Sequence, residues 1–312
     1  MTPSHRNDSG YVGRFAPTPS GPLHAGSLLA AVVSWLDARH HGGRWHLRID
    51  DIDGPRVRPA AESLILQTLE ALALCWDGPL THQSDRTPAY EAALDTLLNG
   101  DHAFACACSR RDLTATGQPG WEGPVYPGTC RNGLPAGREA RAVRARARQR
   151  YWEVEDGFLG LVSFDLEALG SDFVIRRADG IFAYQLATVV DDLKLGITHV
   201  VRGIDLLGST PRQLQLYQAL GHTGPRHAHH PVLVAGDGAK LAKATGAVGV
   251  RTDAVRQELA AILTRIGLAP SDPSTPDTPE QQLSEALSRL RDSGLRDLLL
   301  LSATLPVGPD RR

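Results

Sequence analysis

The chain contains very little lysine. Its 312 residues carry 33 basic side chains, and only Lys194, Lys240 and Lys243 among them are lysine, the rest being arginine. A compact ammonium and a planar guanidinium bind anions differently, so a lysine retained in such a chain is a candidate for function. Two of the three fall in one short segment. We therefore treat Lys240 and Lys243 as a candidate site and expect Lys194 to be an ordinary surface charge.

Cysteine is also scarce, with Cys75, Cys106, Cys108 and Cys130 as the only four. Three of them fall within 25 residues, whereas a secreted disulfide framework spreads its cysteines and pairs them all. The pattern argues against a disulfide-rich secreted protein and predicts a reduced, cytoplasmic one. Cys75 follows an apolar helical pattern, and we expect it to lie in the core.

Long apolar runs are missing as well. No run approaches the roughly 18 residues of a membrane span, and residues 1–10 have no apolar core of the kind found in secretory signals. The formal net charge of −2 argues against a general nucleic-acid coat but leaves a local basic surface open. A hydrophobic content of 42% with 22% charged residues is typical of folded chains. We expect a monomer without a membrane partner.

The beginning of the chain predicts a strand, a turn, a helix and a second strand. Residues 11–16 form a candidate strand, and the three prolines and one glycine of 17–22 exclude regular structure there. Apolar residues then recur at helical spacing from His24. A second strand, 45–49, ends at an aspartate cluster that begins with Asp50. In such a parallel unit ligands bind at the carboxyl ends of the strands, so the turn and the aspartates should share one rim.

Helices and strands alternate through most of the remaining chain. Helices are expected over 59–74, 89–98, 182–195, 209–220 and 252–266, and strands over 172–177 and 198–202. Residues 101–135 differ, since they contain three cysteines and little periodicity and need a clip to hold them together. We predict an α/β fold with a Rossmann-type, doubly wound parallel sheet. Its parts are a split domain (8–100 and 136–250), a Cys-rich insertion (101–135) and a short helical segment (251–312).

Four arginines alternate with other residues at Arg144, Arg146, Arg148 and Arg150. This is strand spacing with one basic face. A solvated edge strand and a strand that contacts phosphates are both open interpretations.

Two elements suit a polyphosphate. A helix that begins near His24 presents unpaired N–H groups and a partial positive charge, and Gly26 lets an anion approach the backbone. Lys240 and Lys243 lie on a glycine-flanked loop that can close on phosphates. An ordinary turn and a solvated loop are the plainer interpretations, although the scarcity of lysine favours function for the loop.

These elements resemble the class I aminoacyl-tRNA synthetases, whose signatures are a His-x-Gly-His turn and a Lys-Met-Ser-Lys-Ser loop. Five ordered segments look like the glutamyl branch of that family: RFAPTPSGPLHAGSLLAA, LRIDDIDGPR, DFVIRRADGIFAYQLATVVDD, THVVRGIDLLGSTPRQLQLYQALG and HHPVLVAGDGAKLAKATGA. They cover roughly residues 11–250, and five motifs in order are far more specific than one.

Within that branch the chain is most similar to the shortened glutamyl-Q tRNA(Asp) synthetases. Ser27, in the fourth position of the turn, is usual for them, and the roughly 60 residues after the lysine loop leave no room for the family's helical anticodon-binding domain. The resemblance implies ATP- and Mg²⁺-dependent activation of L-glutamate without tRNA. It further implies transfer of the glutamyl group to queuosine at the wobble position of tRNA(Asp).

The resemblance also implies which residues bind the substrates. L-Glutamate would contact Arg14, Phe15, Ala16, Pro17, Thr18, Asp50, Tyr184 and Arg202. ATP would contact His24, Gly26, Lys240 and Lys243, with His24 and Lys243 as the catalytic residues. The chemistry agrees, because arginine pairs with a carboxylate and an acid pairs with an ammonium. A core role for Tyr184 and a plain strand-end charge at Arg202 are the alternatives.

The sequence departs from the family at two places. Asp50 stands where the family usually has Glu, so its shorter side chain would need a water or a small shift to reach the substrate amine. Ala242 and Ala244 replace both serines of the lysine loop and remove two hydroxyl donors, while both lysines remain. We expect activity to be retained with looser ordering of the loop.

Cys106, Cys108 and Cys130 provide three thiolates in a segment without a core of its own. This favours a zinc site that needs a fourth ligand, with three free or buried thiols as the alternative. The resemblance implies one structural zinc ion and a tyrosine four residues before the last cysteine, which is Tyr126 here. His102 is a chemical rival for that position.

Three other functions stay open. They are an ordinary glutamyl-tRNA synthetase that charges a tRNA 3′ end, a non-catalytic RNA-binding relic, and a nucleotidyltransferase of similar fold.

Overall fold

The centre of the protein is a parallel sheet. The computed structural model describes residues 10–116, 119–120, 123–233, 250, 254–271 and 278–301. Its parallel strands are β1 (Val12–Phe15), β2 (Arg44–Ile49), β3 (Thr81–His82), β11 (His199–Gly203) and β12 (Arg226–His230). The Thr198 amide donates to the Val12 carbonyl at 2.9 Å and joins β11 to β1. The resulting order, β3-β2-β1-β11-β12, is that of a doubly wound sheet, which confirms the predicted class.

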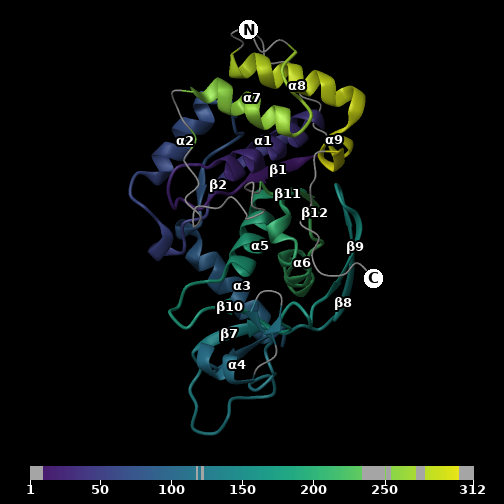
Figure 1. Ribbon diagram of the computed structural model, residues 1–312. Helices are drawn as coiled ribbons and strands as arrows, with labels where there is room; N and C mark the ends of the chain where they lie inside the picture. Colours follow the sequence, from purple (N-terminus) through teal and green to yellow (C-terminus); the bar gives the residue numbers. More distant parts are fainter. Residues whose placement is uncertain are drawn as a thin grey trace.

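Helix α1 (Ala25–His40) follows β1 and is buried along most of its length. The helix ends at His40, and Gly42 beyond it has a φ of 65°, in the left-handed region that glycine adopts without strain. The C-terminal helices α7 (Val255–Arg265) and α8 (Pro279–Ser293) cover α1 on the side away from the sheet (Figure 1). Leu263 of α7 and Leu290 of α8 are both 0% exposed in the same core as α1. The C-terminal helices are therefore part of the main hydrophobic core.

The other helices lie close to their predicted positions, except the one at Arg110–Thr116, which was not predicted. They are α2 (Ala61–Ala71), α3 (Thr87–Asn99), α4 (Arg110–Thr116), α5 (Tyr184–Leu195), α6 (Ser209–Ala219) and α9 (Leu295–Leu301), with short 3₁₀ turns at Gly54–Arg56, Ser84–Arg86 and Ile204–Leu206. A second core cluster joins α3, α5 and α6 through Tyr90, Leu186 and Leu216. Helices α5 and α6 thereby connect the parallel sheet to the insertion (Figure 1).

The expected position of Cys75 in the core is wrong. Helix α2 ends at Ala71, and Ala73 adopts a left-handed φ of 56° that turns the chain away from the helix. Cys75 follows in a loop with its side chain exposed, while its carbonyl accepts hydrogen bonds from Trp35 and Arg39.

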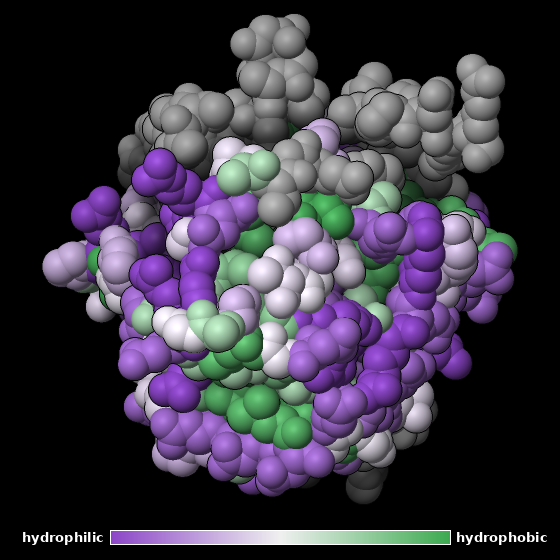
Figure 2. Space-filling model, turned by 90° about the horizontal axis from the view of Figure 1, so that it is seen from below, coloured by the Kyte–Doolittle hydropathy of each residue, from purple (hydrophilic) through white to green (hydrophobic). Residues whose placement is uncertain are grey.

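The insertion is held by a small antiparallel sheet that the sequence did not predict, although it did predict a strand at 172–177, which is the third strand of this sheet. Its strands are β4 (Ala103–Cys106), β7 (Ala142–Ala145) and β10 (Phe173–Arg176), and a short ribbon of β5 (Pro119–Gly120) and β6 (Gly123–Pro124) lies beyond it. Because β4 pairs with β7, the Cys-rich segment is anchored at its beginning. Seen from this end of the molecule, the surface is mostly hydrophilic, with hydrophobic residues in small areas (Figure 2).

A hairpin extends the parallel sheet at its far edge. Strands β8 (Tyr151–Asp156) and β9 (Gly160–Asp165) pair antiparallel, and Asp156 pairs with His227 of β12 in a parallel bridge. Neither this hairpin nor β12 was predicted. Across the described residues, no helix has the length and apolar character needed to cross a membrane.

Candidate active site

The turn between β1 and α1 is fixed by hydrogen bonds on both sides. The Asp50 amide donates to the Pro17 carbonyl at 3.0 Å, and the Arg58 amide donates to the Pro19 carbonyl at 2.9 Å. Thr18 O accepts from the Ser20 amide at 2.8 Å, which tightens the turn. The end of β1 and the end of β2 therefore share one rim, as predicted.

His24 is the N-cap of α1. Its Nδ1 accepts from the backbone amides of Gly26 at 3.1 Å and Ser27 at 3.2 Å, and its Nε2 lies 3.1 Å from the Ser27 hydroxyl. Histidine is an uncommon cap, but the ring nitrogen satisfies two amides that the helix itself leaves unpaired. The predicted ATP-binding residues His24 and Gly26 are thus in direct contact. Ser27 completes the arrangement.

A buried ion-pair network lies beneath the rim. Arg48, 1% exposed, donates from Nε to Asp50 Oδ1 and from Nη1 to Asp192 Oδ1, both at 2.6 Å. Arg14 Nε lies 3.5 Å from Asp192 Oδ2. The neighbouring Asp191 accepts from Gln83, Arg86 and Tyr90. Opposite charges that are buried as pairs are tolerated far better than single ones, so this network fixes the strand ends.

Asp50 is held by Arg48 through both carboxylate oxygens, at 2.6 and 3.4 Å. Burial raises the pKa of Asp50, although Arg48 and Arg14 oppose the rise. A carboxylate has about four acceptor positions, so the bond to Arg48 leaves capacity for a substrate ammonium.

Arg202 at the end of β11 is a buried cation without an anion. It is 4% exposed, and no carboxylate of the described residues lies within 4.0 Å of its guanidinium. Its partners are all neutral acceptors, namely His229 Nε2 at 3.0 Å, Gln213 Oε1 at 2.7 Å, Thr210 Oγ1 at 2.9 Å and Tyr184 OH at 3.5 Å. Burial lowers the pKa of Arg202, which reflects the cost of this isolated charge.

Tyr184 is the first residue of α5 and is 36% exposed. It is therefore not an ordinary core residue. Its hydroxyl contacts Arg202 while its ring stays accessible, which suits a group that lines an open pocket.

Several buried polar atoms beside Arg202 have no hydrogen-bond partner in the described part of the chain. They are Arg14 Nε, Gln213 Nε2 and Tyr217 OH. Burial raises the pKa of Tyr217, with Asp192 adding to the rise and Arg14 and Arg202 opposing it, so this phenol lies among those charges. Buried polar groups are rarely left unpaired, and together these atoms indicate space for a polar ligand.

Phe15, Ala16, Pro17 and Thr18 continue from the end of β1, the strand that carries Arg14, into the turn before α1. Phe15 is buried and stacks on Trp45 with ring centroids 6.1 Å apart, so it supports the floor of the rim. Lys240 and Lys243 lie outside the described residues, as do Ala242 and Ala244.

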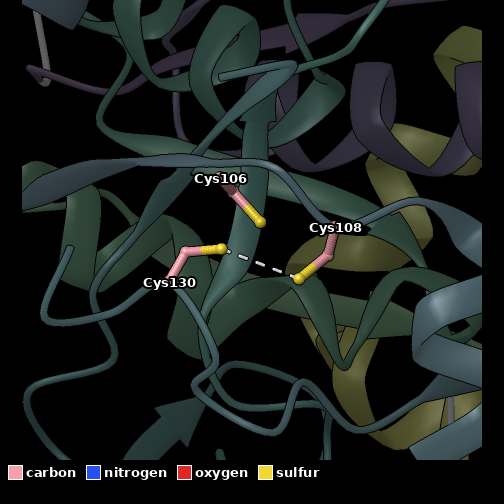
Figure 3. A group of neighbouring side chains, drawn as sticks. All are labelled: Cys106, Cys108 and Cys130. Atoms are coloured by element: carbon pink, nitrogen blue, oxygen red, sulfur yellow. Dashed lines mark hydrogen bonds between the residues drawn. The ribbon is translucent and has the colours of Figure 1, made fainter. Parts of the chain in front are cut away.

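The three clustered cysteines converge as predicted. The sulfur atoms of Cys106, Cys108 and Cys130 all lie within 4.8 Å of one another, and they point toward a common centre (Figure 3). The Tyr126 hydroxyl lies 3.7 Å from Cys106 Sγ and accepts from the Cys130 amide at 2.8 Å. His102 is not among the converging groups of the described chain. Three thiols and a phenol thus provide four potential ligand atoms, the number that tetrahedral zinc requires.

The alternating arginines are mostly engaged by the protein. Arg144 is buried, donates to Cys106 Sγ at 3.4 Å and stacks on the Tyr126 ring. The other three are paired with acidic residues: Arg146 and Arg148 with Asp101, and Arg150 with Asp165 and Glu167. Of the segment from Arg144 to Arg150, only Arg144 and Ala145 are in a strand, at the end of β7. These four arginines therefore do not form a row of unpaired, exposed cations that could bind phosphates.

Several residues of the site had not been singled out from the sequence. Arg48, Asp191 and Asp192 form the ion-pair network, and Asp156 and His229 support Arg202. The sequence contained two signals. Arg48 is a charged residue inside the apolar strand 45–49, and Asp191 and Asp192 are adjacent acids inside an apolar helix. Neither signal shows which opposite charge it will meet, because the partners are up to 144 residues apart.

Comparisons with known proteins agree with this geometry. A family model described as tRNA synthetases class I (E and Q), catalytic domain, matches residues 11–274. A curated protein from Chromobacterium violaceum, named glutamyl-Q tRNA(Asp) synthetase, is 49% identical over 260 residues and covers 83% of this chain and 87% of its own. One of the same name from Dechloromonas aromatica is 50% identical over 262 residues, with the same coverage of 83% and 87%.

A solved structure shares the fold. The glutamate tRNA ligase from Elizabethkingia meningosepticum, in complex with its amino acid, superposes with a TM-score of 0.75 at 25% identity. The match covers 92% of this chain and 65% of that one, so this chain spans about two thirds of the length of that structure.

Proposed function

The chain belongs to the class I tRNA synthetases for glutamate and glutamine and is a ligase, and from this membership we propose that it is a glutamyl-Q tRNA(Asp) synthetase. It activates L-glutamate with ATP in the absence of tRNA. It then transfers the glutamyl group to queuosine at the wobble position of tRNA(Asp).

The buried, unpaired guanidinium of Arg202 carries the proposal. A cation enclosed by neutral acceptors is costly unless a ligand supplies the anion, and a dicarboxylic amino acid supplies two. Arg14 lies beside Asp192 in the same region and has a buried Nε without a hydrogen-bond partner. The two carboxylates of glutamate would pair with Arg14 and Arg202. Its ammonium would pair with Asp50 or Asp192, so the charges of the site match those of glutamate.

The first step forms a mixed anhydride. One α-carboxylate oxygen of glutamate attacks the α-phosphorus of ATP, and pyrophosphate leaves with the electrons of the broken P–O bond. Catalysis of this step consists of positioning and charge stabilisation. His24 and the amides of Gly26 and Ser27 are the groups we assign to the phosphates on the turn side, and Lys240 and Lys243 are those on the loop side. Mg²⁺ bound to ATP supplies further positive charge.

In the second step a hydroxyl of queuosine attacks the carbonyl carbon of the anhydride, and AMP leaves. No protein nucleophile is needed. The anticodon loop must therefore present its wobble nucleotide to the rim that carries Arg14 and Arg202.

We also propose that Cys106, Cys108, Cys130 and Tyr126 hold one structural zinc ion. The four ligand atoms converge in a segment whose own core is small, so a metal there stabilises the insertion. We further propose that the protein acts as a monomer in the cytoplasm, where a reducing environment keeps these thiols available.

A mapping experiment tests the function. The enzyme is incubated with ATP, labelled glutamate and tRNA(Asp) that contains queuosine, and the RNA is digested with nuclease to locate the label. The proposal expects label on the wobble nucleotide and none when the tRNA lacks queuosine. Label at the 3′ end of a tRNA would instead show an ordinary glutamyl-tRNA synthetase.

Glutamate-dependent exchange between ATP and pyrophosphate without tRNA separates the remaining alternatives. The proposal expects exchange. A non-catalytic RNA-binding protein would show none, and a nucleotidyltransferase would show exchange that does not depend on glutamate.

A further inference from the structure

The Nε–H of Arg202 is directed at one acceptor. Its single hydrogen goes to His229 Nε2 at 3.0 Å, while the two Nη groups donate to Gln213, Thr210 and Tyr184. The Nε bond is the one closest to the aliphatic stem, so it sets the plane in which the guanidinium lies. His229 is 0% exposed, which leaves little freedom for either group.

The bond from Arg202 determines the protonation of the His229 ring. Arginine has donors only, so His229 Nε2 must carry its lone pair and not a hydrogen. The hydrogen of the neutral ring is then on Nδ1, which lies 2.5 Å from Asp156 Oδ2. Burial and the charge of Arg202 lower the pKa of His229 to about 4, even though Asp156 opposes the fall. The ring is therefore neutral near pH 7.

Asp156 is itself held in one orientation. Its Oδ1 accepts from three backbone amides, those of Phe158 and Leu159 at 3.0 Å and that of His229 at 3.1 Å. Burial alone would raise the pKa of Asp156, but the bonds from His229 and from the backbone lower it, so the group is ionised. Each link in the series Asp156, His229 and Arg202 therefore has a fixed direction of donation.

We propose that Asp156 and His229 are positioning residues that orient Arg202 toward a carboxylate of the substrate. The inference rests on the proposed function, because it takes glutamate as the ligand of Arg202. Neither residue touches the substrate in this arrangement. Their effect passes through the tautomer of His229, and the turn that joins β8 to β9 becomes part of the amino-acid site.

Asp156→Asn is the sharpest test, because the backbone dictates how an asparagine must sit. Three amides face the Oδ1 position, so the side-chain oxygen of asparagine occupies it and the NH₂ group faces His229. The imidazole must then accept on Nδ1 and carry its hydrogen on Nε2, where it meets the Nε–H of Arg202. Such a reversal of tautomer in an intact structure is known to be damaging in catalytic triads.

We expect Asp156→Asn to raise the Kd and KM for glutamate about ten- to hundredfold, the range for loss of a hydrogen bond to a charged group. The KM for ATP should stay unchanged. Binding is measured by calorimetry with glutamate alone, and KM by ATP–pyrophosphate exchange. Nitrogen-detected NMR of the His229 ring should show hydrogen on Nδ1 in the native protein and on Nε2 in the variant.

Two substitutions of His229 separate positioning from packing. His229→Gln keeps an acceptor for Arg202 and a donor for Asp156, and should bind glutamate within about threefold of the native protein. His229→Leu removes both and should behave like Asp156→Asn. His227→Gln is the matched control, since His227 is 3% exposed on the same strand and forms no hydrogen bond to Arg202 within the described residues.

Native glutamate affinity in Asp156→Asn would overturn the inference, as would equal losses in His229→Gln and His229→Leu. If the native protein itself fails to bind glutamate, the proposed function is wrong, and the inference is wrong with it. A native protein that binds while Asp156→Asn binds equally well refutes the inference alone.

Discussion

Arg14 and Arg202 come from adjacent strands and are both buried, but the protein uses their donors differently. Arg202 donates its Nε–H and at least two Nη hydrogens to protein acceptors. The Arg14 side chain makes a single ion-pair contact at 3.5 Å, to Asp192, and no hydrogen bond within the described residues. Arg202 is therefore fixed in place, whereas Arg14 keeps its donors for a ligand.

Arg14→Gln should raise the KM for glutamate about ten- to hundredfold, since a charge-assisted hydrogen bond contributes about 1.5–3 kcal/mol. The free energy of unfolding should change little, because Asp192 keeps its bond to Arg48. ATP–pyrophosphate exchange and urea unfolding measure the two effects. Arg44→Gln, at an exposed position of β2, is the control and should alter neither. A large loss of stability in Arg14→Gln would show that Arg14 is structural.

Residue identity was easier to predict than residue partnership. Arg14, Arg202 and Tyr184 were predicted from their motifs as site residues. Arg14 and Arg202 lie on adjacent strands, and Tyr184 contacts Arg202. Asp192 was not recognised, because the sequence cannot show that its carboxylate, on helix α5, meets Arg48 of strand β2, 144 positions away. The structure also shows that Arg48 donates to both carboxylate oxygens of Asp50, which the sequence did not indicate. Fewer acceptor positions of Asp50 are therefore left for a ligand.

Strand β12 is an element made of histidines. His227, His229 and His230 are each at most 3% exposed. This strand was not predicted because its buried residues are imidazoles, so it has no apolar strand pattern. Hairpin β8–β9 was missed although it contains alternation, as in Trp152 and Val154 against Glu153.

The same histidines make stability depend on pH. Burial lowers the pKa of all three, and that of His229 falls from 6.5 to about 4. Below pH 6.5 these histidines bind protons in the unfolded chain but stay neutral in the folded chain. The free energy of unfolding therefore decreases as the pH falls. The loss should run from about pH 6.5 to about pH 4 and reach about 3 kcal/mol from His229 alone.

Urea unfolding at half-unit pH steps measures this loss, and His229→Gln should reduce the slope in that window. Constant stability between pH 6.5 and 4.5 would contradict the assignment of neutral, buried imidazoles.

The proposed zinc site of the Cys-rich insertion can also be tested. If one zinc ion is held there, Cys130→Ser should lower the zinc content from about one ion per chain and lower the melting temperature, because three ligands hold the metal less well than four. Elemental analysis after gel filtration gives the content. Cys75→Ser is the matched control, since Cys75 is exposed and outside the cluster. Equal zinc in both variants would remove the cluster as the metal site.

At the scale of the whole molecule, the C-terminal helices are required for the main core. Leu263 of α7 is 0% exposed in the cluster that contains α1. Leu263→Ala should lower the free energy of unfolding by about 2–5 kcal/mol, the range for a large side chain removed from a core. Leu64→Ala, at a residue 39% exposed, should change it by about 0.5 kcal/mol or less. A shift confined to a minor, separate unfolding transition would show that α7 and α8 form an independent unit.

The fold class followed from the sequence because Pro-Gly turns, helical periodicity and five ordered motifs agree with one another. The antiparallel sheet β10-β7-β4 did not follow, since β4 and β7 are short and become strands only by pairing across a 35-residue gap (Ala103–Cys106 with Ala142–Ala145). Local pattern identifies long elements, whereas short strands depend on partners that are distant in the chain.

The hydrogen bond from Thr198 to Val12 also makes the proposed amino-acid site depend on a long-range pairing of the chain. Strands β1 and β11 are 186 residues apart in the chain, yet they are neighbours in the sheet and carry Arg14 and Arg202. Pairing such distant segments is entropically costly, because the long chain between them must close into a loop before the contact can form. The proposed amino-acid site is therefore complete only when β1 and β11 have paired, so the proposed glutamate binding would report that this pairing has formed.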